Sequence, residues 1–234
     1  MNLRPYQLAA ANAVFDKWTK VRSTLVLLPT GMGKTFVASL IIARAQPKRA
    51  LFLAHRKELI FQAQRQIKLA TGLDAEIEMA DRRASVSLFS RMPVVISSIQ
   101  TQISGNRMKR FNPDDFGIVI CDECHRSIGA SWKKVLEHYR QNENIKILGI
   151  TATHDRTDRM SLGAVFESVA YEYNLLDAIE DGWLVPINQQ IATIQGLDYS
   201  AVRTTAGDLN GADLASVLEN ERNLQEIVGA SVKI

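Results

Sequence analysis

Two short segments of this chain carry residue types that could hold a polyphosphate and hydrolyse it. The first, Thr30–Thr35 (TGMGKT), follows the apolar run Leu25–Leu28. The second, Asp122–His125 (DECH), follows the apolar run Phe116–Cys121. A glycine turn that ends in lysine suits phosphate groups, and an acidic pair suits a magnesium ion and an attacking water. The two segments, in this order, predict an ATP-hydrolysing site.

The first segment has the composition of a phosphate-binding loop at the start of a helix. Gly31 and Gly33 permit a tight backbone turn, and apolar residues recur at helical spacing from residue 36 to 41. A strand, a turn and a helix arranged in this way bring backbone N–H groups and the positive end of the helix to one point, which is an anion site. Lys34 would contact the β- and γ-phosphates, and the Thr35 hydroxyl would ligate Mg²⁺. Leu28 stands where the full pattern has its first glycine.

The acidic pair follows a run that is typical of a strand buried on both faces. In open α/β sheets, ligands bind just outside the carboxyl ends of the strands. At that position Asp122 can hold Mg²⁺, and Glu123 can polarise a water for attack on the γ-phosphate.

Two alternatives for the same stretch are not favoured. Cys121–His125 is also a C-x-x-C-H string, the pattern of covalent haem attachment. Haem attachment needs export, but the segment Met1–Tyr6 has no apolar signal sequence. Zinc is not expected either, because these are the only 2 cysteines and the 4 histidines show no clustered ligand spacing. We therefore expect neither haem nor zinc.

Composition indicates an ordinary globular chain. Its 234 residues are 46% hydrophobic and 23% charged, with a formal net charge of +3. The mild basic excess permits a nucleic-acid partner without demanding one. No apolar run approaches the ~18–20 residues of a membrane span. We expect no membrane association and a cytoplasmic or nucleoid-associated protein that is not secreted.

Strand-like and helix-like segments alternate along most of the chain. Buried strands are expected at 25–28, 50–54, 94–96, 116–121 and 145–150. Helices are expected at 6–21, 36–44, 60–67 and 132–139, with a short helix after the strand at 94–96. This alternation predicts an α/β fold, a mostly parallel sheet with helices on both faces. The basic segment Arg107–Phe111 is expected to be a solvated connector rather than a stacking surface for bases.

These residues together resemble the first RecA-like motor domain of superfamily 2 helicases and translocases, a class of P-loop NTPases. The most similar branch is that of repair helicases and restriction-enzyme motor subunits. The resemblance runs from Leu3 to about Ile187, and in this family the missing early glycine is usual. It implies an ATP-binding domain over residues 1–187. Residues 188–234 would be a linker or helical segment that leads towards a second RecA-like domain, absent from this sequence.

The resemblance also implies roles for individual residues. Leu3–Gln7 looks like the adenine-reading segment, with Gln7 on the base edge and Arg4 or Tyr6 packing nearby. Two segments look like motifs that follow a nucleic-acid strand, and a third looks like the link between hydrolysis and domain movement. The residues implied are Thr30, Gly31, Met32, Gly33, Lys34 and Thr35 for ATP; Asp122, Glu123 and His125 for catalysis; Arg56, Ser98, Gln100 and Thr101 for nucleic acid; and Thr151 and Thr153 for coupling.

The leading hypothesis is thus a motor that uses ATP and Mg²⁺ to move along nucleic acid, with DNA favoured over RNA. One alternative is a separate P-loop ATPase or kinase that acts on a small molecule. Such an enzyme would not need Gln7, Gln100 or the segment 151–153. Another alternative is a catalytically idle nucleic-acid-binding module. The presence of Lys34 together with the acidic pair disfavours it.

Overall fold

The computed structural model describes residues 3–87, 91–124, 129–152, 162–188, 200, 202–205 and 208–219. The chain forms two compact units, Met1–Val185 and Pro186–Ile234. No helix of the described residues combines the length and apolar character that a bilayer crossing requires.

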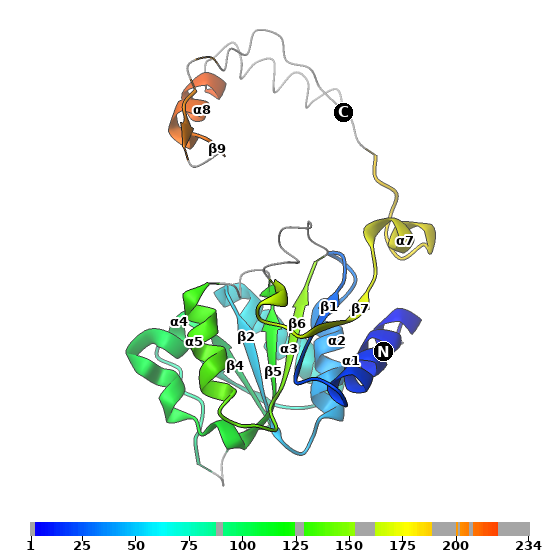
Figure 1. Cartoon of the computed structure of the whole chain (residues 1–234), viewed down its shortest axis with the longest axis vertical. Coiled ribbons are helices and arrows are strands. Elements are labelled where there is room, and N and C mark those ends of the chain that lie inside the picture. Colours follow the sequence, from blue (N-terminus) through cyan, green and yellow to red (C-terminus); the bar gives the residue numbers. More distant parts are fainter. Residues whose placement is uncertain are drawn as a thin grey trace. The chain divides into compact units, whose positions relative to one another are not determined.

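The first unit is built on a seven-stranded sheet whose pairings are all parallel (Figure 1). Its spatial order is β3-β4-β2-β5-β6-β1-β7. The strands are β1 (Ser23–Leu27), β2 (Arg49–Ala54), β3 (Ala75–Glu78), β4 (Val94–Ser98), β5 (Phe116–Asp122), β6 (Lys146–Thr151) and β7 (Ser168–Glu172). The predicted parallel α/β sheet is confirmed.

The helices of this unit follow the strands in sequence. They are α1 (Pro5–Trp18), α2 (Lys34–Arg44), α3 (Lys57–Thr71), α4 (Ile99–Ile103), α5 (Ala130–Tyr139) and α7 (Leu175–Glu180), with the 3-10 turns η1 (Ser104–Arg110) and η2 (Pro113–Asp115). The predicted helices have their counterparts in α1, α2, α3, α4 and α5.

Two apolar clusters show that helices cover both faces of the sheet. Successive strand residues point to opposite faces, so Phe52 of β2 packs with α1, α2 and α3, while Leu51 and Leu53 pack with α4 and α5. The five predicted strands are those with both faces covered, which explains their continuous apolar runs.

The two edge strands, β3 and β7, were not predicted. β3 has the sequence Ala-Glu-Ile-Glu and β7 the sequence Ser-Val-Ala-Tyr-Glu. An edge strand has a paired neighbour on one side only, and both of these strands mix polar with apolar residues. Neither contains the continuous apolar run on which the prediction depended.

The basic segment Arg107–Phe111 is not a solvated connector, and that prediction was wrong. Glu78 of β3 is fully buried and accepts hydrogen bonds from Arg107 Nε at 2.7 Å and Arg110 Nη1 at 3.0 Å. The Phe111 side chain is buried against Phe116. The two arginines turn towards the protein and not towards solvent, because a buried carboxylate needs an opposite charge beside it.

The second unit contains a short hairpin, β8 (Thr204–Thr205) and β9 (Asp208–Leu209), followed by helix α8 (Gly211–Leu218). The Asn210 side chain caps α8 by accepting from the N–H groups of Ala212 and Asp213. Arg203 forms an exposed ion pair with Asp213. This helix lies within residues 188–234, for which the sequence predicts a linker or helical segment. The interpretation of residues 188–234 as a lead towards another domain stays a prediction.

Because the strands of the first unit are parallel, their carboxyl ends lie together along one side of the sheet, which we call the carboxyl edge and which is distinct from the edge strands. The loops after β1, β2, β4, β5 and β6 therefore begin at that edge. They start with Leu28, His55, Ile99, Glu123 and Ala152. All the predicted motif segments between residues 28 and 153 begin at this edge.

Candidate active site

The loop between β1 and α2 has the backbone that its glycines predict. Gly31 and Gly33 have φ angles of +87° and +76°, in the left-handed region that residues with a Cβ rarely adopt. The Met32 side chain is buried in the core, which holds the backbone of the loop in place. Lys34 opens α2, and the loop therefore lies at the positive end of this helix. This is the geometry of a phosphate-binding loop.

Lys34 of this loop reaches the acidic pair that follows β5. Its Nζ lies 3.4 Å from Glu123 Oε1, and the Lys34 side chain is only 11% exposed. Thr151 at the end of β6 is fully buried, and its Oγ1 donates to Glu123 Oε2 at 3.5 Å. The start of α2, the residue after β5 and the end of β6 therefore meet at one point, with Glu123 at its centre.

Glu123 adopts a backbone conformation that is unusual for a residue with a side chain. Its φ angle is +50°, in the left-handed region. Such strain persists only where the surrounding structure imposes it, and it is found preferentially at functional sites. Here it ends β5 sharply and turns the chain into the segment that follows.

Asp122 is buried beside Glu123, with 7% of its surface exposed. Burial, and then the negative charge of Glu123, raise the pKa of Asp122 to about 6, although the charge of Lys34 opposes the shift. Two carboxylates thus share one partly desolvated site with a single lysine close by. A divalent cation at Asp122 would relieve their repulsion, so the donor set fits Mg²⁺.

The predicted adenine-reading segment packs directly against the phosphate-binding loop. Tyr6 Oη donates to the Met32 carbonyl at 2.9 Å, and Gln7 Nε2 donates to the same carbonyl at 3.4 Å. Gln7 Oε1 accepts from the Arg4 N–H at 3.2 Å. A primary amide has a second N–H and a second acceptor lone pair, so Gln7 keeps capacity for a ligand. A Cβ at Gly33 would lie 2.8 Å from Gln7 Nε2, so a side chain there would displace the Gln7 amide in addition to straining the backbone.

Two aromatic residues far along the chain complete this region, and the sequence analysis did not identify them as site residues. The Tyr6 ring stacks on Tyr173 at 5.6 Å and meets Trp183 edge-on at 5.4 Å. The Arg4 guanidinium carbon lies 5.4 Å from the centre of the Trp183 ring. Their segment follows an edge strand that was not predicted, so nothing in the sequence pattern placed it beside residues 4–7.

The predicted nucleic-acid residues differ in what they offer. Arg56 and Gln100 are exposed after β2 and β4, and Gln100 Nε2 lies 3.0 Å from His55 Nδ1. Ser98 and Thr101 are nearly buried. The Ser98 Oγ donates to Thr101 Oγ1 at 2.8 Å and accepts from the Thr101 N–H at 3.1 Å, which caps α4.

A pocket of about 470 Å³ has Gln100 in its lining. It is lined by His55, Ile99, Gln100, Ile103, Ser104, Ser131 and Trp132. His125 and Thr153, which were also predicted as site residues, lie outside the described residues.

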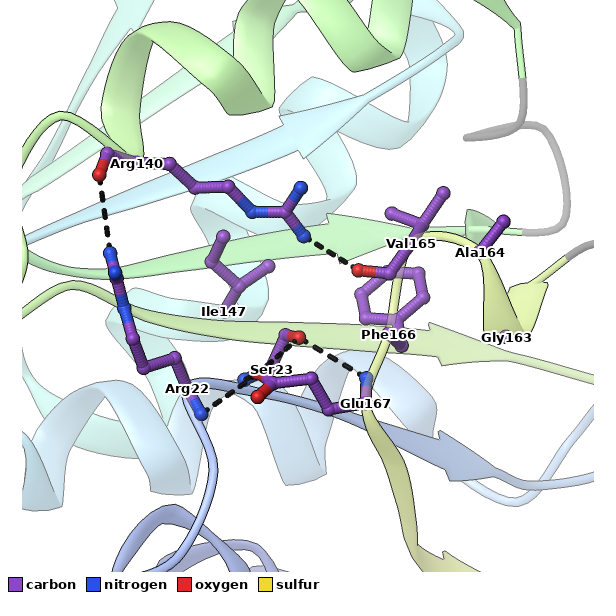
Figure 2. A pocket seen from close by; sticks show the side chains of 9 residues that line it. All are labelled: Arg22, Ser23, Arg140, Ile147, Gly163, Ala164, Val165, Phe166 and Glu167. Carbon is purple, nitrogen blue, oxygen red and sulfur yellow. Dashed lines mark hydrogen bonds between the residues drawn. The ribbon is translucent and has the colours of Figure 1, made fainter.

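A second pocket, of about 370 Å³, lies at the opposite edge, where β1 and β6 begin (Figure 2). Its charged groups hold the fold together. Arg22 Nη2 donates to the Arg140 carbonyl, Arg140 Nη2 donates to the Val165 carbonyl, and Glu167 accepts from Ser23 Oγ at 2.8 Å (Figure 2). This pocket is remote from the carboxyl ends of the strands and takes no part in the candidate active site.

With this geometry established, comparison with known proteins decides the family. The profile of the family described as Type III restriction enzyme, res subunit, matches residues 1–156 of the 234. The chain belongs to this family. Its match ends beyond β6 and so includes the loop after β1, the acidic pair and Thr151.

The curated relatives of the chain are much longer proteins. The chain is 31% identical, over 97% of its length, to a Schizosaccharomyces pombe protein provisionally named mitochondrial ATP-dependent helicase irc3. It is 29% identical, over 94% of its length, to the Escherichia coli Type I restriction enzyme EcoAI endonuclease subunit. The chain covers 36% and 28% of these relatives, about a third of their length.

Solved structures of similar fold agree. The Pyrococcus furiosus Hef helicase domain matches with a TM-score of 0.59 at 22% identity, over 70% of this chain and 37% of that chain. The Type ISP restriction-modification enzyme LlaGI, in complex with a DNA substrate mimic, matches with a TM-score of 0.58 at 19% identity, over 78% of this chain and 21% of that chain. The predicted RecA-like fold and the resemblance to the first motor domain of superfamily 2 are confirmed.

Proposed function

We propose that this chain is the ATP-binding motor domain of an ATP-dependent nucleic-acid helicase or translocase, which couples ATP hydrolysis to movement along DNA. The single observation that carries the proposal is the contact between Lys34 and Glu123. It joins the phosphate-binding loop after β1 to the acidic pair after β5, across the intervening strand β6. Relatives that cover nearly all of this chain are named ATP-dependent helicases, which supports the same function.

The residues of the loop would bind the triphosphate. The N–H groups at the start of α2 point towards the loop, and Lys34 adds a mobile positive charge. Bound phosphate would compete with Glu123 for the Lys34 ammonium, because both are anionic and within reach of it. Withdrawal of Lys34 would leave the Glu123 carboxylate free of this ion pair, and it could then accept a proton from water as a general base.

Asp122 and the Thr35 hydroxyl would hold Mg²⁺, which when bound would neutralise charge on the phosphates. Glu123 would then accept a proton from the attacking water. Thr151 keeps the other Glu123 oxygen in place. Thr151 is the last residue of β6. A movement of Glu123 would therefore displace Thr151 and the segment that follows β6, which is the proposed route of coupling.

Nucleic acid would contact the exposed residues at the same edge of the sheet. Arg56 and the Gln100 amide are suited to backbone phosphates and sugars, contacts that carry no sequence information. The buried hydroxyls of Ser98 and Thr101 would act by fixing the start of α4. DNA is favoured because two of the similar restriction enzymes, LlaGI and LlaBIII, were solved with DNA.

The proposal is tested by titrating the chain with a fluorescent ATP analogue and Mg²⁺. Lys34→Ala should weaken binding by about ten- to a hundredfold, because it removes a charge-assisted phosphate contact of roughly 1.5–3 kcal/mol. Lys20→Ala, at an exposed lysine outside the site, is the matched control and should bind as the unmodified chain does. Equal affinity in the two variants, both folded by circular dichroism, would reject the assignment.

A further inference from the structure

The proposed function leaves one element beside the nucleotide site without a role. This return segment, Tyr173–Leu184, begins where β7 ends and includes α7. The Tyr173 N–H donates to the Leu27 carbonyl at 3.0 Å, so the segment starts beside the end of β1. The N–H groups of Trp183 and Leu184 both donate to the Ala178 carbonyl, at 2.9 and 3.0 Å. These bonds fold the segment back on itself and fix the position of Trp183.

Trp183 lies at one end of a continuous line of contacts that leads to the phosphate-binding loop. Its ring is 5.4 Å from the Arg4 guanidinium carbon. Arg4 Nη1 donates to Tyr6 Oη at 3.2 Å, and Tyr6 Oη donates to the Met32 carbonyl at 2.9 Å. The orientation of the Arg4 side chain is therefore set from two directions, by an aromatic ring and by a hydroxyl that is itself anchored.

Leu184 approaches the same loop at a second point. A Cβ placed on Gly31 would lie 3.3 Å from Leu184 Cδ2. The return segment thus touches the loop directly as well as through Arg4. Trp183 and Leu184 remain half-buried, whereas Trp18 and Trp132 are almost completely buried.

We propose that Trp183 is a positioning residue for the adenine base. It would hold the Arg4 guanidinium as a flat stacking surface for the purine, with Gln7 at the base edge. A guanidinium plane has two faces, and aromatic rings bind to either of them. The Arg4 guanidinium lies over the Trp183 ring, and Arg4 as a whole is exposed, so the guanidinium is also accessible to a base. This inference rests on the proposed ATP site.

Base recognition and phosphate recognition are separable in a binding measurement. Affinity is measured for Mg²⁺-ATP and for Mg²⁺-tripolyphosphate, which has no base. Trp183→Ala should weaken ATP binding by about two- to thirtyfold, the range of a cation–π contact, and leave tripolyphosphate binding unchanged. Trp183→Phe keeps an aromatic ring and should restore most of the ATP affinity. Leu176→Ala, at a 67% exposed position of the same segment, is the matched control.

Arg4→Ala gives a second test that does not require Trp183 to be changed. It should produce the same loss for ATP alone, and Trp183→Ala added to it should weaken ATP binding no further. Additive losses, or an equal loss of ATP and tripolyphosphate in Trp183→Ala, would overturn the positioning role. If the unmodified chain bound neither ligand, the proposed function itself would fail. Binding of both with no effect of Trp183→Ala would overturn this inference alone.

Discussion

Lys34, Asp122 and Glu123 form a charge cluster with a net negative balance in a partly desolvated site. Two carboxylates face one ammonium group, and the pKa of Asp122 rises to about 6 because of burial and the neighbouring Glu123. The negative charge of this site exceeds its positive charge. A cation that binds to it offsets the excess negative charge and then attracts the anionic phosphates, which is a physical reason for coupled binding of metal and nucleotide.

Replacement of Glu123 separates binding from chemistry. Glu123→Gln keeps the shape of the side chain, removes the base and releases Lys34 from its ion pair. Nucleotide should therefore bind at least as well as before, while single-turnover hydrolysis should fall by about 10²–10⁴, the usual contribution of a general base. Glu137→Gln, on the exposed side of α5, serves as control. Parallel losses of affinity and hydrolysis would contradict the role given to Glu123.

At the scale of elements, the edge strand β7 matters because the return segment leaves from it. Among the described strands β7 pairs only with β1, and Glu167 holds its start in place. The Glu167 carboxylate accepts from Ser23 Oγ at 2.8 Å and from the N–H groups of Ser23 and Arg22 at 2.7 and 2.9 Å. Partial desolvation pushes the pKa of Glu167 up, but the hydrogen bonds from Ser23 and Arg22, with the charge of Arg140, outweigh it and hold the pKa below the ordinary 4.5.

This lowered pKa predicts a pH dependence of stability. A carboxyl group whose pKa is lower in the folded state stabilises the fold above its unfolded pKa, and the effect is lost as pH falls through the folded pKa. Glu167→Gln should thus lower the melting temperature at pH 7, and the difference from the unmodified chain should shrink below about pH 4.5. Thermal unfolding at pH 7 and pH 3 measures this. Glu180→Gln, outside this hydrogen-bond cluster, should show no such pH-dependent difference; an effect of Glu167→Gln that stayed constant with pH would contradict the prediction.

At the scale of the whole molecule, one sheet edge carries every proposed ATP and nucleic-acid contact described between residues 28 and 151. These residues supply the proposed phosphate-binding loop, the acidic pair and the proposed coupling residue Thr151 from a single RecA-like unit. In the relatives, about a third of the length matches this chain, and the remaining two thirds are long enough for further domains. We expect that stepping along a strand needs closure between two such units, since one rigid unit has no second body to move against.

Residues 1–234 alone should therefore bind nucleotide, hydrolyse it slowly and fail to unwind a duplex. A chimera that adds the region following the matched part of the Schizosaccharomyces pombe relative should hydrolyse ATP about 10³–10⁵-fold faster, the range of an arginine supplied from another domain. Its rate should also depend on nucleic acid. A steady-state ATPase assay with and without single- and double-stranded DNA and RNA measures both effects. Rapid, nucleic-acid-stimulated turnover by the 234-residue monomer would show that the site is already complete.

Local patterns in the sequence determined the central strands, the helices behind them and the chemistry of the two motif segments. Continuous apolar runs identify β1, β2, β4, β5 and β6 because both faces of these strands are covered. Glycines at 31 and 33 predict the turn because few other residues adopt its φ angles. Motif order alone placed Lys34 and the acidic pair in one site, since carboxyl ends of parallel strands share an edge.

Only the tertiary structure revealed what depends on contacts between distant segments. The edge strands β3 and β7 have a neighbouring strand on one side only and mix polar with apolar residues, so they carry no continuous apolar signal. Arg107 and Arg110 look like solvated charges until Glu78, buried on β3, is placed beside them. Trp183 meets Arg4 because β7 pairs with β1 and returns the chain to the nucleotide site, a pairing that no local pattern specifies. Sequence periodicity reports the environment of each residue, whereas its partner is decided by which strands pair and where the chain returns.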